Sequence, residues 1–150
     1  KDVGIDIDKV TGGPIVNQFF ETSIPGIFAC GNCLQVYDTV DVLSLGAKKA
    51  GKHAAKNDFK EENKVSYVYA GKGIRYVIPQ RITEPGKVSF SLRVEKPQEA
   101  SMMRVNADGK EIFKKKLPWV NPANMVEFSL DITDNIVYSE KKLEVALDDA

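Results

Sequence analysis

Two cysteines with a redox-like spacing are the residues of this chain that could most directly do chemistry. Cys30 and Cys33 enclose Gly31 and Asn32, which gives the C-x-x-C spacing of dithiol redox pairs. Such a pair normally lies where a strand meets a helix N-terminus, because the helix end lowers the pKa of a thiol. Here the segment 34–38 separates Cys33 from the helix that the sequence predicts. We therefore favour a structural interpretation, with Cys30 as a small buried apolar residue and Cys33 as a loop thiol.

Other catalytic or metal-binding patterns are weak. A structural zinc site takes a tetrahedral set of Cys or His ligands, whereas the chain has two Cys and one His, so we expect no metal. His53 lies in a lysine-rich segment, and we expect it at the surface or near a helix end rather than as a base. Ser-His-Asp chemistry has no second histidine or nucleophile pattern to support it. The catalytic residues therefore stay unassigned.

Hydropathy predicts the elements that hold these residues. The run at 27–30 is continuously apolar and of strand length, typical of a buried parallel strand. It follows a turn at 22–26 that contains Pro and Gly. From about 40 to 57, apolar residues recur at intervals of three and four, which predicts a helix. Either Asp38 or Thr39 could cap that helix.

Local predictions also follow from turn residues and glycines. The Thr-Gly-Gly-Pro turn at 11–14 separates an alternating apolar segment at 3–7 from a short β element at 15–20. Gly46 and Gly51 lie inside the predicted helix, where each costs ~1 kcal/mol relative to Ala. We expect both glycines to mark close approaches of the helix backbone to a neighbouring element.

The segment 22–32, Thr-Ser-Ile-Pro-Gly-Ile-Phe-Ala-Cys-Gly-Asn, carries the most specific pattern. It resembles the late FAD-contacting motif T-x-x-x-G-[IVL]-[FY]-A-x-G-D of pyridine nucleotide-disulfide oxidoreductase-like flavoproteins, over roughly residues 1–57. Asn32 stands where this family usually has Asp, and its amide oxygen can still accept a hydrogen bond. With 11–14 and 37–41 included, the chain most resembles the branch of hydrogen cyanide synthase subunits and of NAD(FAD)-dependent dehydrogenases associated with glycerol-3-phosphate dehydrogenase.

The resemblance implies FAD as the cofactor, with Gly31 and Asn32 at one edge of its site. It also implies that the helix start near Val40 and Asp41 faces the flavin pyrimidine ring, where backbone amides would stabilise the negative charge of reduced flavin. The parent enzyme would pass hydride through flavin and use NAD or NADP. The alternative is that Gly31 and Asn32 only end a strand and that the helix is an ordinary packing helix.

The phosphate-binding fingerprint of such enzymes is missing. No G-x-G-x-x-G follows a predicted strand, so the loop that would hold the pyrophosphate is absent. We therefore expect the chain to be the C-terminal piece of a longer enzyme and inactive alone, with the remainder of the parent flavoprotein as its partner. Two cysteines in 150 residues, together with the resemblance, lead us to expect a cytoplasmic protein.

Composition argues against two classes of partner. The 21 basic residues balance 21 acidic ones, and 43% hydrophobic residues is close to the average of globular proteins. We therefore expect no nucleic-acid partner. No apolar run approaches the ~20 residues that span a bilayer, so we expect no membrane insertion.

The charged stretch at 57–64 separates two hydropathy patterns, and we place a domain boundary there. Residues 1–60 would be the C-terminal segment of an FAD/NAD(P)-binding α/β domain, and residues 61–150 a β domain. Seven apolar runs in the second part predict strands, at 65–69, 74–78, 88–94, 103–107, 112–117, 126–132 and 143–147. Asp108-Gly109 predicts a hairpin between two of them.

The expected fold class is therefore α+β, the end of an FAD-binding domain followed by a small antiparallel β-sandwich with an immunoglobulin-like outline. Its aromatic residues could line a binding surface, but we expect them to pack mainly in the core or at sheet edges; they are Tyr67, Tyr69, Tyr76, Phe113 and Trp119. The basic run at 114–116 would be either a solvated strand end or the protection of a sheet edge. The alternative function is a non-catalytic interaction module, in which the sandwich docks a partner subunit or forms a homodimer.

Overall fold

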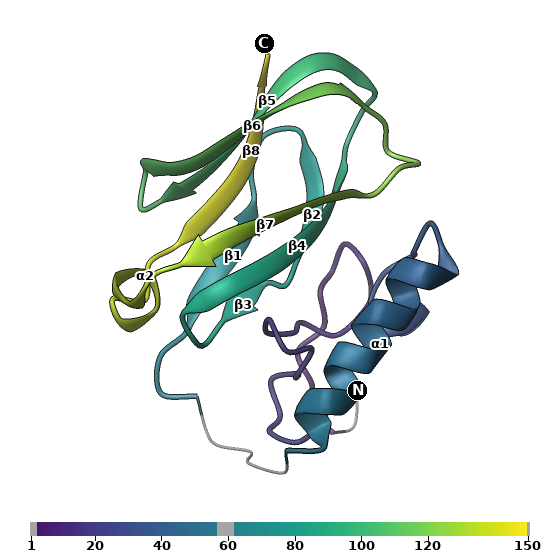
Figure 1. Ribbon diagram of the computed structural model, residues 1–150, viewed down its shortest axis with the longest axis vertical. Helices are drawn as coiled ribbons and strands as arrows, with labels where there is room; N and C mark the ends of the chain where they lie inside the picture. Colours follow the sequence, from purple (N-terminus) through teal and green to yellow (C-terminus); the bar gives the residue numbers. More distant parts are fainter. Residues whose placement is uncertain (1–2, 57–61, 150) are drawn as a thin grey trace. The chain divides into compact units, whose positions relative to one another are not determined.

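Two structural units, Lys1–Asn63 and Lys64–Ala150, make up the chain in the computed structural model (Figure 1). The structure describes residues 3–56 and 62–149, so most of the predicted boundary segment at 57–64 lies outside the described residues. The longer of the two described helices belongs to the first unit, and the second unit is built mainly from strands in two sheets. The fold is therefore mixed α/β.

The first unit contains a 3-10 helix, η1 (Gly31–Cys33), and the helix α1 (Val40–Ala54). The predicted helix start near residue 40 is confirmed, and Thr39 takes the N-cap position with extended backbone. The side chain of Thr39 makes no capping hydrogen bond. Lys52 and His53 lie in the last turn, where positive charge complements the helix dipole. Neither described helix is long and apolar enough to cross a membrane.

The predicted strand at 27–30 is wrong. Within that segment only Phe28 takes part in β pairing, through an isolated antiparallel bridge to Glu21. A buried parallel strand needs hydrogen-bonding neighbours along its length. The described part of this unit offers isolated bridges instead of a ladder, so the apolar run stays irregular.

The predicted β element at 15–20 is also largely wrong, because its second half is a turn. The N–H of Phe20 donates to the carbonyl oxygen of Asn17 at 3.0 Å, and Phe20 has φ +69°. The Asn17 side-chain oxygen accepts from the N–H groups of Phe19 at 2.9 Å and Glu21 at 3.1 Å. The backbone groups that would pair in a strand therefore make hydrogen bonds within the turn instead.

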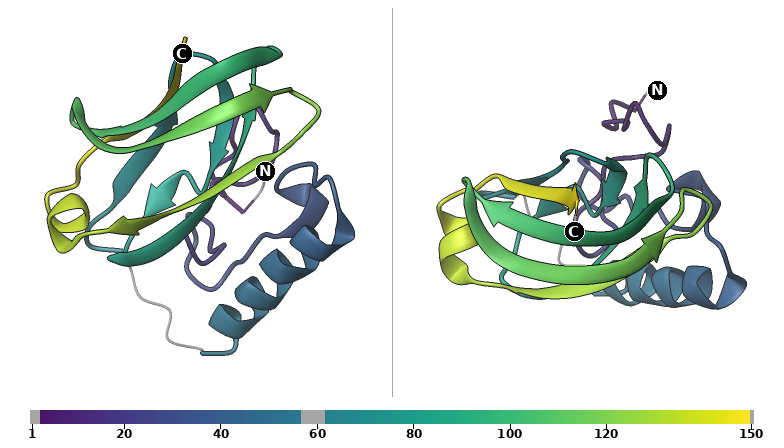
Figure 2. Two further views of the ribbon diagram at one scale, coloured as in Figure 1. Left: turned by 45° about the horizontal axis from the view of Figure 1, so that its top comes forward. Right: turned by 90° about the horizontal axis from the view of Figure 1, so that it is seen from above.

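The second unit consists of two β-sheets (Figure 2). The five-stranded sheet has the order β3-β1-β8-β5-β6, with strands β1 (Ser66–Ala70), β3 (Arg81–Ile82), β5 (Gln98–Ala107), β6 (Lys110–Val120) and β8 (Leu143–Asp149). The three-stranded sheet has the order β2-β4-β7, with strands β2 (Ile74–Ile78), β4 (Gly86–Val94) and β7 (Val126–Ile132). All seven predicted runs form strands. The short strand β3 and the helix α2 (Asp134–Tyr138) were not expected from the sequence.

One strand pair corrects the wholly antiparallel prediction. β1 and β8 run parallel, with Tyr69 opposite Glu144, whereas the other ladders of the described strands are antiparallel. Parallel neighbours need a long crossover, and here the intervening strands supply it. Hydropathy could not reveal this, because alternation of side chains is the same in both kinds of ladder.

The register explains which side chains form the core of the second unit. Phe90 of β4 lies opposite Phe128 of β7, and their rings stack with centroids 5.0 Å apart. Phe113 of β6, in the larger sheet, also stacks on Phe128 at 5.6 Å. On the opposite face of β4, Ser89 lies opposite Ser129, with hydroxyl oxygens 3.2 Å apart. The two sheets thus bury one face each against a shared apolar core, a sandwich-like arrangement.

The prediction that aromatic residues pack in the core or at sheet edges is confirmed for Tyr76 and Phe113 in the core and for Trp119 on the edge strand β6, and is wrong for Tyr67 and Tyr69. Tyr67, Tyr69 and Trp119 are 47%, 48% and 51% exposed, so none of them belongs to the core. Tyr67 and Tyr69 share the outward face of β1 because they are two positions apart. The lysines at 114–116 are exposed on β6, an edge strand of the larger sheet, as predicted.

The predicted Asp108-Gly109 hairpin is confirmed between β5 and β6. Asp108 has φ +48° and Gly109 has φ +82°. The Asp108 side chain accepts a hydrogen bond from the N–H of Lys142 at 3.0 Å, and its other oxygen lies 3.7 Å from the Lys141 ammonium group. The turn is therefore tied to the segment that enters β8.

We predict opposite effects of one substitution at two open glycines. A Cβ at Gly109 or at Gly51 would meet no atom within 4 Å, so backbone conformation alone decides the outcome. Gly109→Ala forces a left-handed Ala and should lower the unfolding free energy of the second unit by about 1–2 kcal/mol. Gly51→Ala should raise that of the first unit by about 0.5–1 kcal/mol, because Ala favours helix. Urea unfolding followed by Trp119 fluorescence and by helical circular dichroism measures both changes, and equal signs would contradict the prediction.

Candidate functional site

The four residues that the resemblance singles out come from two neighbouring elements of the first unit. Gly31 and Asn32 begin η1, whereas Val40 and Asp41 form the start of α1. η1 packs against α1, and a Cβ at Gly31 would lie 3.9 Å from Cδ1 of Leu43. The structure therefore places the Gly-Asn turn beside the first turns of the helix.

Side chains around this helix start face solvent. Asn32 and Asp41 are exposed, and Val40 is 75% exposed. Val36, in the segment that connects η1 with α1, is 67% exposed. Single exposed apolar residues are ordinary, but two of them beside an exposed amide and a helix start make a surface that a planar ligand could cover.

The start of α1 can interact with an anion. The N–H of Leu43 donates to the carbonyl oxygen of Thr39 at 3.3 Å, so helical bonding begins there. The first-turn N–H groups of a helix have no acceptor within the helix and carry partial positive charge. Asp41 already places one negative charge in the first turn, the end of the helix that favours it. A ligand that develops negative charge would be stabilised at this end.

Gly13 makes the backbone contact that supports the candidate site, and sequence reasoning missed this contact. It is buried, and a Cβ at this position would lie 2.4 Å from the carbonyl oxygen of Leu34 and 2.6 Å from that of Cys33. No side chain fits such a gap, so the backbone of the 11–14 turn lies directly on the end of η1. The Gly-Gly pair was the available signal, but a turn alone accounts for it equally well.

Asp8 fixes the turn that carries Gly13. Its carboxylate oxygen accepts from the N–H groups of Val10 at 2.7 Å and Thr11 at 3.2 Å. The Thr11 hydroxyl in turn accepts from the N–H of Gly13 at 3.1 Å. Local hydrogen bonds thus preorganise the turn against which η1 rests.

The two cysteines show the geometry of structural thiols. Both are free, with Cys30 half-buried and Cys33 exposed. The Cys33 thiol donates to the carbonyl oxygen of Cys30 at 3.0 Å. Cys33 ends η1 and does not stand at the start of α1, so it lacks the helix-end position that activates redox thiols.

Aromatic residues of the 17–21 turn hold the second half of α1. The His53 ring lies 4.1 Å from the Phe19 ring, centroid to centroid, and the Lys49 ammonium group lies 5.9 Å from the Phe20 ring centroid. Burial lowers the pKa of Lys49. Burial also lowers the pKa of His53, and the positive charges of Lys56, Lys49 and Lys52 lower it further. The end of α1 therefore carries a positive field.

Within residues 3–56 and 62–149, no group of three or more His, Cys, Asp and Glu side chains lies close enough to hold a metal ion.

Comparison of the chain with protein-family models, with curated proteins and with solved structures finds no match. Function must therefore be inferred from the residues and their geometry.

We predict that Gly13→Ala destabilises the first unit while Gly46→Ala does not. The methyl group added by Gly13→Ala would overlap two backbone carbonyls, which should cost about 2–3 kcal/mol of unfolding free energy. At Gly46 a Cβ would meet Phe20 at 3.5 Å and the Tyr37 hydroxyl at 3.6 Å, which is ordinary contact. Urea unfolding of the two variants, followed by the helical signal, gives the comparison. A Gly13→Ala variant as stable as the Gly46→Ala variant would show that η1 does not rest on this turn.

We predict that His53 titrates below its ordinary pKa of about 6.5 and that a single lysine tunes it. Lys56→Gln removes a positive charge three residues from His53 and should raise the pKa of His53. Lys48→Gln should leave that pKa nearly unchanged, because a residue five positions away lies on another side of the helix. Since the unfolded chain binds the proton more readily, stability should fall as pH drops through about 6.5 and level off below the folded pKa. Imidazole NMR titration of the three proteins measures the shifts, and an equal response to both substitutions would refute the assignment.

Proposed function

We propose that the chain is part of an FAD-dependent oxidoreductase of the pyridine nucleotide-disulfide oxidoreductase-like type, and that its first unit supplies one edge of the flavin site. The observation that supports this most is the packing of the Gly31-Asn32 turn beside the start of α1. The turn and the helix start, which the family motif would bring to the same cofactor, are thus adjacent in space. Their exposed side chains leave room for a ligand.

Each residue has a specific role in this proposal. Gly31 has φ +73°, which lets the extended chain at Cys30 turn into η1 without the strain of a side chain. The exposed amide of Asn32 would accept a hydrogen bond from a ribityl hydroxyl. The N–H groups of Val40 and Asp41 would face the pyrimidine edge of the ring, where reduction builds up negative charge. FAD, when bound, supplies hydride transfer to or from the substrate.

The rest of the cofactor site must come from elsewhere. The chain has no G-x-G-x-x-G loop, so the pyrophosphate and NAD or NADP would bind to the remainder of the parent flavoprotein. In this proposal the first unit is the end of an FAD-binding domain. The second unit follows it as a sandwich with an immunoglobulin-like outline, and the isolated chain is inactive.

The alternative is an interaction module, which the exposed aromatic residues of the second unit favour. Tyr67 and Tyr69 present rings 6.5 Å apart on the outward face of β1, and Trp119 is exposed on β6. Tyr and Trp are enriched where proteins bind one another. Such a module would dock a partner subunit or a second copy of the chain without chemistry of its own.

The test is FAD binding by the chain and by the full-length parent, each mixed with FAD, desalted and examined by visible absorbance. We expect flavin bands in the parent only. In the parent, Asn32→Leu should weaken FAD binding up to about tenfold, because one hydrogen bond is lost, and Asn32→Asp should restore it.

Each outcome separates the two functions. A parent that retains no flavin would overturn the oxidoreductase proposal, and a colourless chain that forms a stable dimer or partner complex would support the interaction module. Retention by the isolated chain would show that it carries more of the site than proposed. Unchanged FAD affinity in the Asn32→Leu variant would show that the Asn32 amide does not contact the cofactor.

A further inference from the structure

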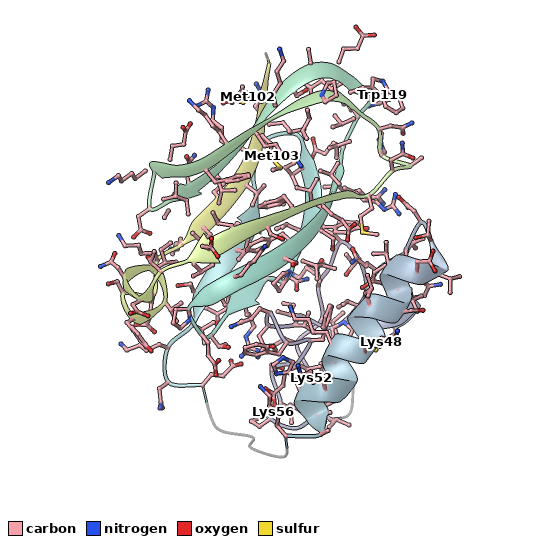
Figure 3. All side chains as sticks on the ribbon, in the orientation of Figure 1. Lys48, Lys52, Lys56, Met102, Met103 and Trp119 are labelled. Carbon is pink, nitrogen blue, oxygen red and sulfur yellow. The ribbon has the colours of Figure 1, made fainter. Side chains whose placement is uncertain are left out.

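Three lysines and a leucine form a line along α1 that we call the lysine face. Intervals of three, four and four residues separate Leu45, Lys48, Lys52 and Lys56, a spacing that puts residues on one side of a helix. Figure 3 labels the three lysines along α1 and just past its end. All four are exposed, Leu45 by 66%. Lys56 lies just past the C-cap Ala55, where its N–H still bonds to the His53 carbonyl oxygen at 3.1 Å. From Lys48 to Lys56 the line is roughly 12 Å long.

Within residues 3–56 and 62–149, no acidic side chain forms an ion pair with these three lysines. Neither Lys48 nor Lys52 has an acidic residue three or four positions away on the helix. Among the described residues, the ion pairs involve other lysines and arginines. Like charges four residues apart are mildly destabilising, and this happens twice here. Burial lowers the pKa of His53, and the positive charges of Lys56 and Lys52 add to this effect.

The helix dipole explains only part of the pattern. The dipole favours cations within the last turn, which includes Lys52 but not Lys48. Lys49 is accounted for separately, by its contact with the Phe20 ring. Gly51, next to Lys52, is exposed, and a Cβ there would meet no atom within 4 Å, so nothing within the described chain requires a glycine. A surface that approaches the helix from outside would require one.

We propose that the lysine face docks an acidic electron-carrier protein. The lysines favour a partner whose carboxylates have a matching spacing. Leu45 adds an apolar contact, as protein interfaces commonly combine apolar and charged residues. A nucleic acid fits less well, because the chain has no net charge and the line lacks arginine and aromatic residues. That the partner carries electrons rests on the proposed flavin function; its acidity rests on the lysines alone.

The place of the lysine face along α1 suits this role. Lys48 lies eight residues after Val40, which is roughly 12 Å along the helix axis from the proposed flavin edge. A small carrier seated on the face would therefore approach the flavin from the side of the helix. Electron-transfer encounters of this kind are small, weak and guided by charge.

The test is surface plasmon resonance with an immobilised acidic ferredoxin and, separately, an acidic flavodoxin. The chain should bind at about 0.05 M salt and lose most of its affinity at about 0.5 M, where screening is strong. Lys48→Gln/Lys52→Gln/Lys56→Gln should weaken binding about tenfold or more. The matched control is Lys114→Gln/Lys115→Gln/Lys116→Gln, which removes the same charge from the β6 edge and should change affinity less than about twofold. Gly51→Ala should weaken binding although it stabilises the helix.

Several results would overturn the inference. Failure of both carriers to bind, or equal weakening by the two triple variants, would remove the lysine face as a docking site. Binding of a single-stranded oligonucleotide or an anionic vesicle through the same lysines, with no carrier binding, would assign the face to another class of partner. If the parent retains FAD while the carriers fail to bind, the docking inference is wrong and the flavin function stands. A parent without FAD would overturn the flavin function without altering the measured docking.

Discussion

The candidate site depends on one backbone contact, the approach of Gly13 to the carbonyl groups at the end of η1. The first unit has no β ladder within its described residues that could fix the Gly-Asn turn. The turn is held instead by a second turn, which Asp8 and Thr11 organise through short hydrogen bonds. A side chain at residue 13 would displace η1 and separate Asn32 from the helix start. The close packing at buried Gly13 therefore determines the position of the exposed Asn32 amide.

The second unit is stabilised by a different principle, the pairing of sheets around stacked aromatic rings. Phe128 contacts Phe90 within its own sheet and Phe113 from the other sheet, so one ring joins both layers. On the outward face of the larger sheet, Arg104 of β5 binds Glu111 of β6 and Asp148 of β8, which raises the pKa of the guanidinium through these two hydrogen bonds. Exposed ion pairs contribute little, so the rings and the aliphatic core account for most of the stability.

The sequence predicted best where local pattern and tertiary contact agree. The seven strand runs and the start of α1 were predicted because each carries its own periodicity, and Asp108-Gly109 because only a few residue types accept positive φ. The prediction of a strand at 27–30 was wrong because an apolar run does not indicate whether neighbouring strands are present to pair with it. The parallel pairing of β1 with β8 was not predicted for a similar reason. Alternation of apolar and polar residues is the same whether a strand runs parallel or antiparallel to its neighbour. At the site, Gly31, Asn32, Val40 and Asp41 came from a motif, whereas the contact of Gly13 is a distance between segments twenty residues apart, which no local pattern encodes.

Helix α1 shows how stability and interaction compete within one element. On one side, the Phe19 ring packs on His53 and the Phe20 ring faces the ammonium group of Lys49. Its outer side has a glycine that no contact among the described residues explains, and a line of lysines without an ion-pair partner among those residues. Both features lower the stability of an isolated helix. A surface selected only for folding would replace Gly51 with Ala and alternate the charges, as stabilised proteins do. Under the docking proposal, a bound acidic partner would offset both of these costs.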